Sequence, residues 1–363
     1  MSLSPHQSSK RRNLGRSMPT RRQNVANKTA LKHCERWERD LTFREQRWFY
    51  MYEDIGTIIS NGFNTWKQNL NIAVPFILST VAITILVMAM LALIFLPVIS
   101  SLPESTVSSL PELLTSPENV EDLEKIMDAV GGSIENRIGT VVATALFFVV
   151  VASLVYTFFW AGGIGMAKEA TEKGQTSLGR MWSSGKRHYS NLFLANALMI
   201  LLMIVGAFVL ILPIIIITES VFSADSFTPV VVLWLLPIIL YFILISLALA
   251  LMPYALVIEG KGPIDAIKTG INFFLSNKMD VFLVWLVILA VSMALGFVGL
   301  PFSESEIGSM IWQILSGLIN MLVILPLTTV WWVRLYMTRT GKATYDAYEN
   351  VYDDARDEEV KYL

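Results

Sequence analysis

Six long runs without a charged residue dominate this chain and limit what it can fold into. Their approximate bounds are residues 72–99, 140–166, 192–218, 230–258, 281–300 and 310–333. Each run reaches or exceeds the roughly 20 residues that an α-helix needs to cross the hydrocarbon core of a bilayer. A segment in lipid must satisfy its own backbone hydrogen bonds, so runs of this length fold as helices. The sequence therefore predicts an all-α integral membrane protein, a helical bundle of six transmembrane helices.

The composition agrees with this class. Hydrophobic residues make up 54% of the 363-residue chain and charged residues only 16%, whereas soluble domains contain about 25% charged residues. Prolines in or beside the runs mark places where the spanning helices can bend. They are Pro75, Pro97, Pro213, Pro237, Pro253 and Pro326.

The connecting segments alternate in charge, which predicts the orientation. Lys and Arg are concentrated in residues 167–191, in 259–280 and after the last run, whereas 219–229 and 301–309 contain none and 100–139 is strongly acidic. Cytoplasmic loops of membrane proteins carry an excess of Lys and Arg. We therefore expect a multi-pass protein of the cell membrane with both termini in the cytoplasm.

A unit that occurs three times precedes the first, third and fifth runs. The copies begin at Asp54 (DIGTIISNGFNTWKQNLN), Ser177 (SLGRMWSSGKRHYSN) and Gly262 (GPIDAIKTGINFFLSN). In each copy, apolar residues recur at helical spacing and Lys or Arg lies off that stripe, which predicts a short amphipathic helix on the cytoplasmic membrane surface. The candidate motif residues are Gly62, Asn69, Gly185, Asn191, Gly262, Pro263, Gly270 and Asn277. We expect each asparagine to cap the following spanning helix through its side-chain oxygen.

The chain divides into three predicted regions. Residues 1–50 form a basic, partly disordered cytoplasmic region, 51–337 the six-span membrane domain, and 338–363 an acidic, tyrosine-rich cytoplasmic tail. We expect the basic region to contact anionic lipid headgroups. Nucleic-acid binding is the less favoured alternative, so the expected partners are membrane lipids, and any protein partner is unknown.

Few residues are available for chemistry. The chain has three histidines, all outside the runs, and one cysteine, and no run contains an ionisable residue before Arg334. Proton-coupled transporters usually carry ionisable residues at membrane depth. We therefore expect no catalytic, cofactor or metal site and no enzymatic activity. We interpret the small residues at 161–165 as a close helix contact, and we weigh the polar residues inside the runs, Asn196 among them, as helix contacts ahead of a substrate path.

The segment IEGKGPIDAIKTGINFFLSN (258–277) has the most specific pattern. With its acidic-Gly-Lys-Gly-Pro turn, amphipathic helix and asparagine, it resembles the membrane-domain family found beside glycerophosphoryl diester phosphodiesterases, and its stand-alone uncharacterised prokaryotic relatives. The resemblance implies about six spans over residues 54–336. It does not extend to the catalytic domain, whose residues have no counterpart here. The function that we predict is a non-enzymatic accessory, scaffold or lipid-organising component. The alternative is a transporter or permease for a small uncharged or amphiphilic solute.

Overall fold

The computed structural model describes residues 53–100, 131–132, 135, 137–218 and 227–346. All of them belong to one compact unit, 51–363. The described residues form helices and no strand, which confirms the all-α fold. The predictions for residues 1–50 and for the tail beyond residue 346 lie outside the described residues.

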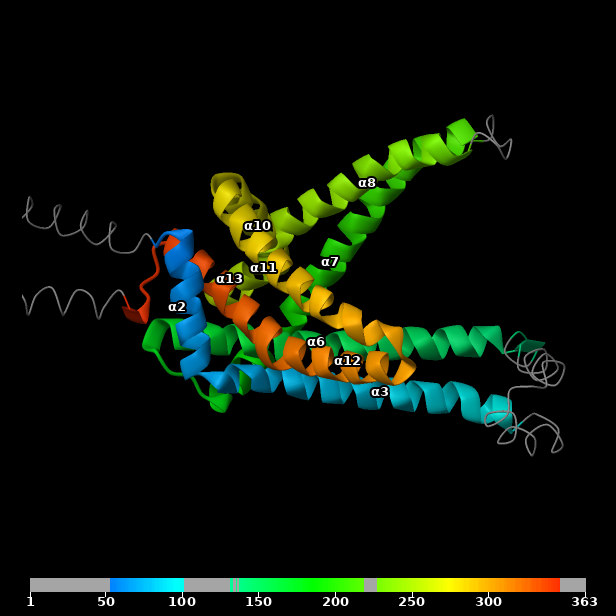
Figure 1. The fold of residues 1–363 in the computed structure, drawn as a ribbon, viewed down its shortest axis with the longest axis horizontal. Coiled ribbons are helices and arrows are strands. Elements are labelled where there is room, and N and C mark those ends of the chain that lie inside the picture. The colour runs from blue at the N-terminus through cyan, green and yellow to red at the C-terminus, as the bar shows by residue number, and fades with distance from the viewer. Residues whose placement is uncertain (1–52, 101–130, 133–134, 136, 219–226, 347–363) are drawn as a thin grey trace, which may run out of the picture. The chain divides into compact units, whose positions relative to one another are not determined.

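The described helices are shown in chain order by colour in Figure 1. They are α2 (Ile55–Gln68), η1 (Leu70–Ala73), α3 (Val74–Ile99), α6 (Ile138–Lys173), α7 (Leu178–Thr218), α8 (Phe227–Leu249), α9 (Met252–Glu259), α10 (Pro263–Ser276), α11 (Lys278–Gly299), η2 (Leu300–Glu304), α12 (Glu306–Ile319), η3 (Asn320–Ile324) and α13 (Leu325–Arg339).

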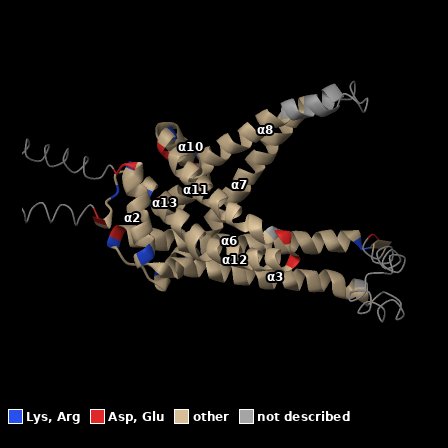
Figure 2. Cartoon of the chain, in the orientation of Figure 1, with Lys and Arg blue, Asp and Glu red and all other residues tan. Residues whose placement is uncertain are grey.

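Six helical segments of the described chain are long and apolar enough to cross a membrane. They are Leu70–Pro97, Ile138–Lys173, Leu178–Pro213, Leu235–Glu259, Lys278–Phe302 and Glu306–Arg339. They coincide with the six predicted runs, so the chain is a multi-pass membrane protein. Charged residues lie toward the ends of these helices and not in their middles, and one group of them lies where α6 and α13 finish and α7 begins (Figure 2). We call this end the basic end.

Helix α6 is the centre of the packing and contacts α3, α7 and α13. Three glycines in its second half allow this close approach. A Cβ atom on Gly162 would lie 2.8 Å from the Met181 side chain of α7, and one on Gly163 would lie 2.9 Å from the Phe76 ring of α3. Small residues let helix backbones approach closely in membranes. The interpretation of residues 161–165 as a helix contact is confirmed.

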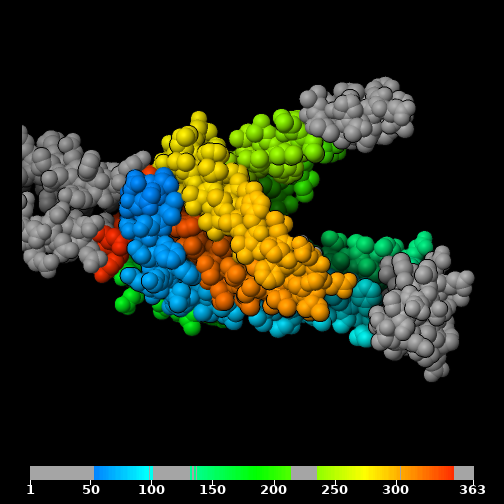
Figure 3. All heavy atoms as spheres, in the orientation of Figure 1, coloured from blue at the N-terminus to red at the C-terminus, as the bar shows by residue number. Residues whose placement is uncertain are grey.

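Helix α2 begins at a cap and packs on α13. The Asp54 carboxylate accepts hydrogen bonds from the backbone N–H groups of Gly56 and Thr57, which satisfies two donors that a helix start leaves open. The indole Nε1 of Trp331 donates to the carbonyl oxygen of Ile59 at 3.0 Å. In the space-filling view, α13 is visible between α2 and α11 (Figure 3). Part of the apolar face of α2 therefore packs against α13.

Two of the predicted spans are interrupted at a proline. The fourth run separates into α8 and α9 just before Pro253, and the last run passes through the π-turn η3 just before Pro326. A proline lacks a backbone N–H and its ring crowds the preceding turn, which interrupts the regular helix. By contrast, Pro97, Pro213 and Pro237 lie inside continuous helices.

The second copy of the predicted unit does not form a separate surface helix. Helix α7 runs without interruption from Leu178 to Thr218, and Asn191 lies exposed within it. The prediction of a short surface helix that ends before a new helix at Asn191 is therefore wrong. The physical reason is that nothing near this asparagine breaks a helix, and the part of α7 that precedes it is packed on α6 through Met181, Ser184 and Gly185. Copies one and three do end at their asparagines, as α2 and α10.

Candidate functional site

The basic end contains a buried ion cluster centred on Arg334 of α13. The Arg334 side chain is 0% exposed. Its Nε donates to Oε2 of Glu53 at 2.7 Å and its Nη2 donates to Oε1 at 2.6 Å. The same guanidinium pairs with Asp346 and donates to the Thr65 hydroxyl at 3.3 Å. We call these four residues the Arg334 cluster.

A second arginine extends the cluster toward α11. Arg339 donates from Nη1 to the carbonyl oxygen of Glu53 at 2.8 Å, and its Nε pairs with the carboxylate of Asp280. Both arginines therefore contact Glu53, which lies just before α2. A planar guanidinium that meets a carboxylate with two parallel N–H groups forms one of the stronger ion pairs in proteins. The cluster joins the first and last described segments of the chain.

A separate polar group surrounds Glu259 at the end of α9. The Tyr336 hydroxyl donates to Oε1 of Glu259 at 2.7 Å, and the ammonium groups of Lys261 and Lys342 lie 2.8 Å and 3.3 Å from its carboxylate. Lys342 also lies over the Tyr336 ring. We call these four residues the Glu259 cluster. It holds the α9–α10 turn against α13.

The three glycines predicted within the repeated unit all lie at tight helix contacts. A Cβ on Gly62 would lie 2.5 Å from the Trp331 ring, one on Gly185 would lie 2.9 Å from the Phe158 carbonyl oxygen, and one on Gly270 would lie 3.1 Å from the Met252 backbone nitrogen. Their role in the structure is packing against α13, α6 and α9.

The remaining motif residues have simpler positions. Gly262 precedes α10 with an extended backbone, and Pro263 occupies the first position of that helix, where its missing N–H costs nothing. Nothing lies within 4 Å of a Cβ built on Gly262. The structure does not bring the eight motif residues together into one site.

The predicted capping role of the asparagines is wrong. Neither Asn69 nor Asn277 makes a side-chain cap on the helix that follows it. The Asn69 amide instead donates to the carbonyl oxygen of Gly174 at 2.9 Å, and its Oδ1 accepts from the Thr176 N–H at 3.1 Å. Asn277 donates to the carbonyl oxygen of Phe273 within α10. Asn69 therefore fastens the start of the first span to the α6–α7 turn, because the neighbouring turn offers better partners than the following helix.

Farther into the bundle, a lateral groove opens between α6, α7 and α3. Its volume is about 760 Å³. It is lined by Ile83, Val149, Val150, Ala152, Ser153, Tyr156, Thr157, Trp160, Phe193, Asn196, Ala197, Met199 and Ile200. Ser153 and Thr157 donate to carbonyl oxygens of their own helix. Within the described residues the Asn196 amide has no hydrogen-bond partner. The groove is apolar with one free amide on its wall.

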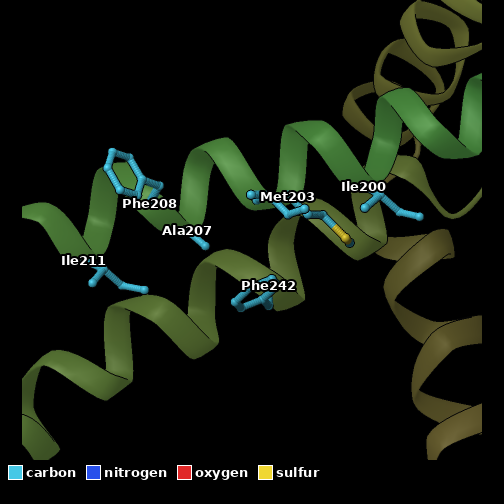
Figure 4. A pocket seen from close by; sticks show the side chains of 7 residues that line it. Ile200, Met203, Ala207, Phe208, Ile211 and Phe242 are labelled. Atoms are coloured by element: carbon cyan, nitrogen blue, oxygen red, sulfur yellow. The ribbon is translucent and has the colours of Figure 1, made fainter. Parts of the chain in front are cut away.

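A smaller groove of about 340 Å³ lies between α7 and α8 (Figure 4). Ile200, Met203, Ile204, Ala207, Phe208 and Ile211 of α7 and Phe242 of α8 line it. The two helices are held together nearby by the Tyr241 hydroxyl, which donates to the carbonyl oxygen of Leu202 at 2.9 Å. Its wall is apolar throughout, with the thioether sulfur of Met203 among the lining atoms. Among the described residues no group of three His, Cys, Asp or Glu side chains is placed to hold a metal ion.

Comparison with known proteins assigns the chain to a family. A model described as a domain of unknown function, DUF7847, matches residues 77–338. The chain belongs to the DUF7847 family. An uncharacterised protein of Archaeoglobus fulgidus is 24% identical over 306 residues, which cover 80% of this chain and 97% of that protein. No solved structure matches. A family of uncharacterised proteins agrees with the sequence expectation, whereas kinship with the phosphodiesterase membrane domains stays a prediction.

Sequence reasoning missed both ion clusters of this DUF7847 protein. It treated Arg334 only as a basic residue beyond the last span. The signal was present, because Arg334 continues the apolar residues of α13 without a break (WWVRLYMTR) and Glu53 stands just before the α2 cap. Their separation of 281 positions concealed the pairing.

Proposed function

We propose that this DUF7847 protein is a non-enzymatic membrane component that organises lipids. The supporting observation is the groove between α6, α7 and α3, which has a volume of about 760 Å³ and a mostly apolar lining. Outside the protein the bilayer offers acyl chains to such a surface, so one or two of them are the natural occupants. The all-apolar groove between α7 and α8 favours the same ligand.

The ion clusters support a structural role for the charged residues. Arg334 is saturated by Glu53, Asp346 and Thr65, and the Glu259 carboxylate by its three partners. Ionised groups that are paired with one another in this way are poorly suited to donate or accept a proton from a substrate. We include in the proposal an absence of enzymatic activity and kinship with the membrane domains found beside glycerophosphoryl diester phosphodiesterases.

The proposal also includes an orientation and a partner. The excess of Lys and Arg in residues 167–191 and 259–280 supports a cytoplasmic position for the basic end and for both termini. It further supports contact between the basic residues of 1–50 and anionic lipids, which adds attraction to the cytoplasmic leaflet.

The test is the lipid retained by purified protein. Ala197 lines the groove between α6, α7 and α3, so Ala197→Trp places a large ring in it. Leu194→Trp is the matched control, because Leu194 is 51% exposed on the same helix and is not part of the lining. We expect native mass spectrometry in a mild detergent to show at least a threefold loss of bound lipid for Ala197→Trp only. Equal retention by both variants and the parent protein contradicts the proposal.

One observation favours transport of an amphiphilic solute as a second function. The amide of Asn196 has no partner among the described residues and faces an apolar groove, where an unpaired polar group is costly. A solute with one polar head satisfies it. Proteoliposomes that move a fluorescent amphiphile across the bilayer, with loss of movement in Ala197→Trp, support transport over lipid organisation.

A further inference from the structure

A second group of basic side chains at the basic end has one acidic partner among the described residues, the partly exposed Glu172. Arg180 lies in the first turn of α7. Its Nε is buried and has no hydrogen-bond partner, and no ion pair within the described ranges involves its guanidinium. A buried donor without an acceptor costs about 1–3 kcal/mol, and more when it is charged. No acidic side chain in the described part of the chain therefore pairs with the charge of Arg180.

His188 lies two turns farther along the same helix and is nine-tenths buried. It is 9% exposed, and neither ring nitrogen has a hydrogen-bond partner in the described part of the chain. Its Cε1 lies 4.0 Å from the position that a Cβ on Gly260 would occupy, which places the ring beside the α9–α10 turn. The positive charges of Arg187, Arg180 and Lys168 all act on it. No carboxylate is among the groups that do.

Lys168 reaches the same place from α6. Its ammonium donates to the carbonyl oxygen of Ile258 at 3.1 Å and lies 3.7 Å from the Glu172 carboxylate. The charges of Arg180 and Lys342 act on Lys168 from α7 and from the segment after α13. Glu172 is the only acidic side chain that acts on it in the described residues, and it is 35% exposed. We call Lys168, Arg180 and His188 the basic site.

The basic site is arranged for an anion with several acceptor oxygens. The positive charges of Lys168 and Arg180 repel one another at a partly buried position, and a bound anion removes this cost. The guanidinium fork matches the spacing of phosphate oxygens and binds them by charge-assisted hydrogen bonds. We propose that Lys168, Arg180 and His188 bind a phosphate group at the membrane boundary.

The position of the site suggests where the phosphate comes from. Lys168 follows the apolar run 140–166 by two residues, and the carbonyl of Ile258 ends the run 230–258. Basic pockets between transmembrane helices on the cytoplasmic side bind the headgroups of anionic lipids. A lipid headgroup and a free phosphate share this chemistry. The lipid source rests on the proposed lipid-organising function, whereas phosphate binding by itself does not.

The experiment measures phosphate binding and lipid selection on the full chain in nanodiscs. The variants are Arg180→Gln and His188→Gln, with Lys173→Gln as the control, because Lys173 lies on α6 at the same end with its side chain 67% exposed. In phosphatidylcholine nanodiscs, inorganic phosphate at constant ionic strength should raise the melting temperature of the parent protein and of Lys173→Gln. We expect Arg180→Gln and His188→Gln to bind phosphate at least tenfold more weakly.

A stability reading without phosphate separates binding from folding. Arg180→Gln removes an unpaired charge from among like charges, so without phosphate it should melt no lower than the parent protein. In the lipid arm, the protein is reconstituted in mixed phosphatidylglycerol and phosphatidylcholine, and its retained lipids are counted. Enrichment of phosphatidylglycerol that Arg180→Gln abolishes supports the headgroup as the source, and a phosphate response without enrichment supports free phosphate.

Two results overturn the proposal. One is a phosphate response and a lipid ratio that are both unchanged in Arg180→Gln. The other is an equal loss in Lys173→Gln, which assigns the effect to general surface charge. Ala197→Trp belongs to the test of the groove and leaves the phosphate arm unaffected, so failure of the lipid-organising function and failure of this site give different results.

Discussion

Replacement of Arg334 by glutamine tests the ion cluster most directly. The arginine is fully buried and holds the Glu53 carboxylate, whose side chain is only 10% exposed, through two hydrogen bonds of 2.6 and 2.7 Å. Removal of one partner of a buried pair costs about 3–5 kcal/mol, because it leaves the other charge buried and uncompensated. We expect Arg334→Gln to lower the free energy of unfolding by about this amount.

The partners should give a graded series. Glu53→Gln leaves Arg334 paired with Asp346 and Thr65, and loss of the hydrogen bonds to a charged group costs about 1.5–3 kcal/mol. Asp346→Asn should cost about 0–1 kcal/mol, because its side chain is 37% exposed and water screens the pair. The double variant with both Arg334 and Glu53 changed should cost less than the sum of its parts.

The measurement is equilibrium unfolding in mixed micelles, where the SDS fraction is varied and tryptophan fluorescence reports the transition. Arg137→Gln is the control, because Arg137 is exposed at the start of α6, and we expect a change within about 0.5 kcal/mol. A loss below about 1 kcal/mol for Arg334→Gln refutes the reasoning. So does additivity of the Arg334 and Glu53 substitutions.

Three further predictions follow from the helix contacts and the charge pattern. Gly270→Ala should lower the free energy of unfolding by about 1–3 kcal/mol, because its Cβ would press on the α9 backbone; Gly296→Ala, with nothing within 4 Å, should not. Asn69→Ala should cost about 1–3 kcal/mol by leaving buried partners in the α6–α7 turn unpaired, and a silent result in thermal melts contradicts that contact. With the single native cysteine replaced by serine, a cysteine at Ser108 should react with an impermeant thiol reagent outside cells and one at Gln175 only after lysis; the reverse pattern contradicts the proposed orientation.

The parts of the fold that depend on local pattern were predictable from the sequence. The six spans followed from uncharged length, and the end of α2 and of α10 followed from periodicity that stops at Asn69 and Asn277. The continuous α7 was not predictable, because whether a helix passes an asparagine depends on what it packs against, and the packing of α7 on α6 appears only in the structure. Proline likewise marked places to bend without saying which of them interrupt a helix.

The candidate sites could not be predicted from the sequence, because they consist of residues that only the folded structure brings together. Glu53 and Arg334 are each ordinary boundary residues in the sequence, and only the packing of α2 on α13 brings their side chains together. The basic site was equally hidden, because Lys168, Arg180 and His188 fall into a segment that reads as a simple basic loop. Counting charges in loops predicts orientation, but it gives no information on which charges find partners.

The Arg334 cluster also has a mechanical consequence. Glu53 and Asp346 lie at the two ends of the described chain, and the Arg334 guanidinium pairs with both. The path of the polypeptide is thereby closed into a ring, although its ends are not bonded. Helical proteins commonly begin to unravel at a free terminus. Tension applied to either terminus therefore acts first on the Arg334 cluster. We expect α2 and α13 to detach together, in one step and at one force.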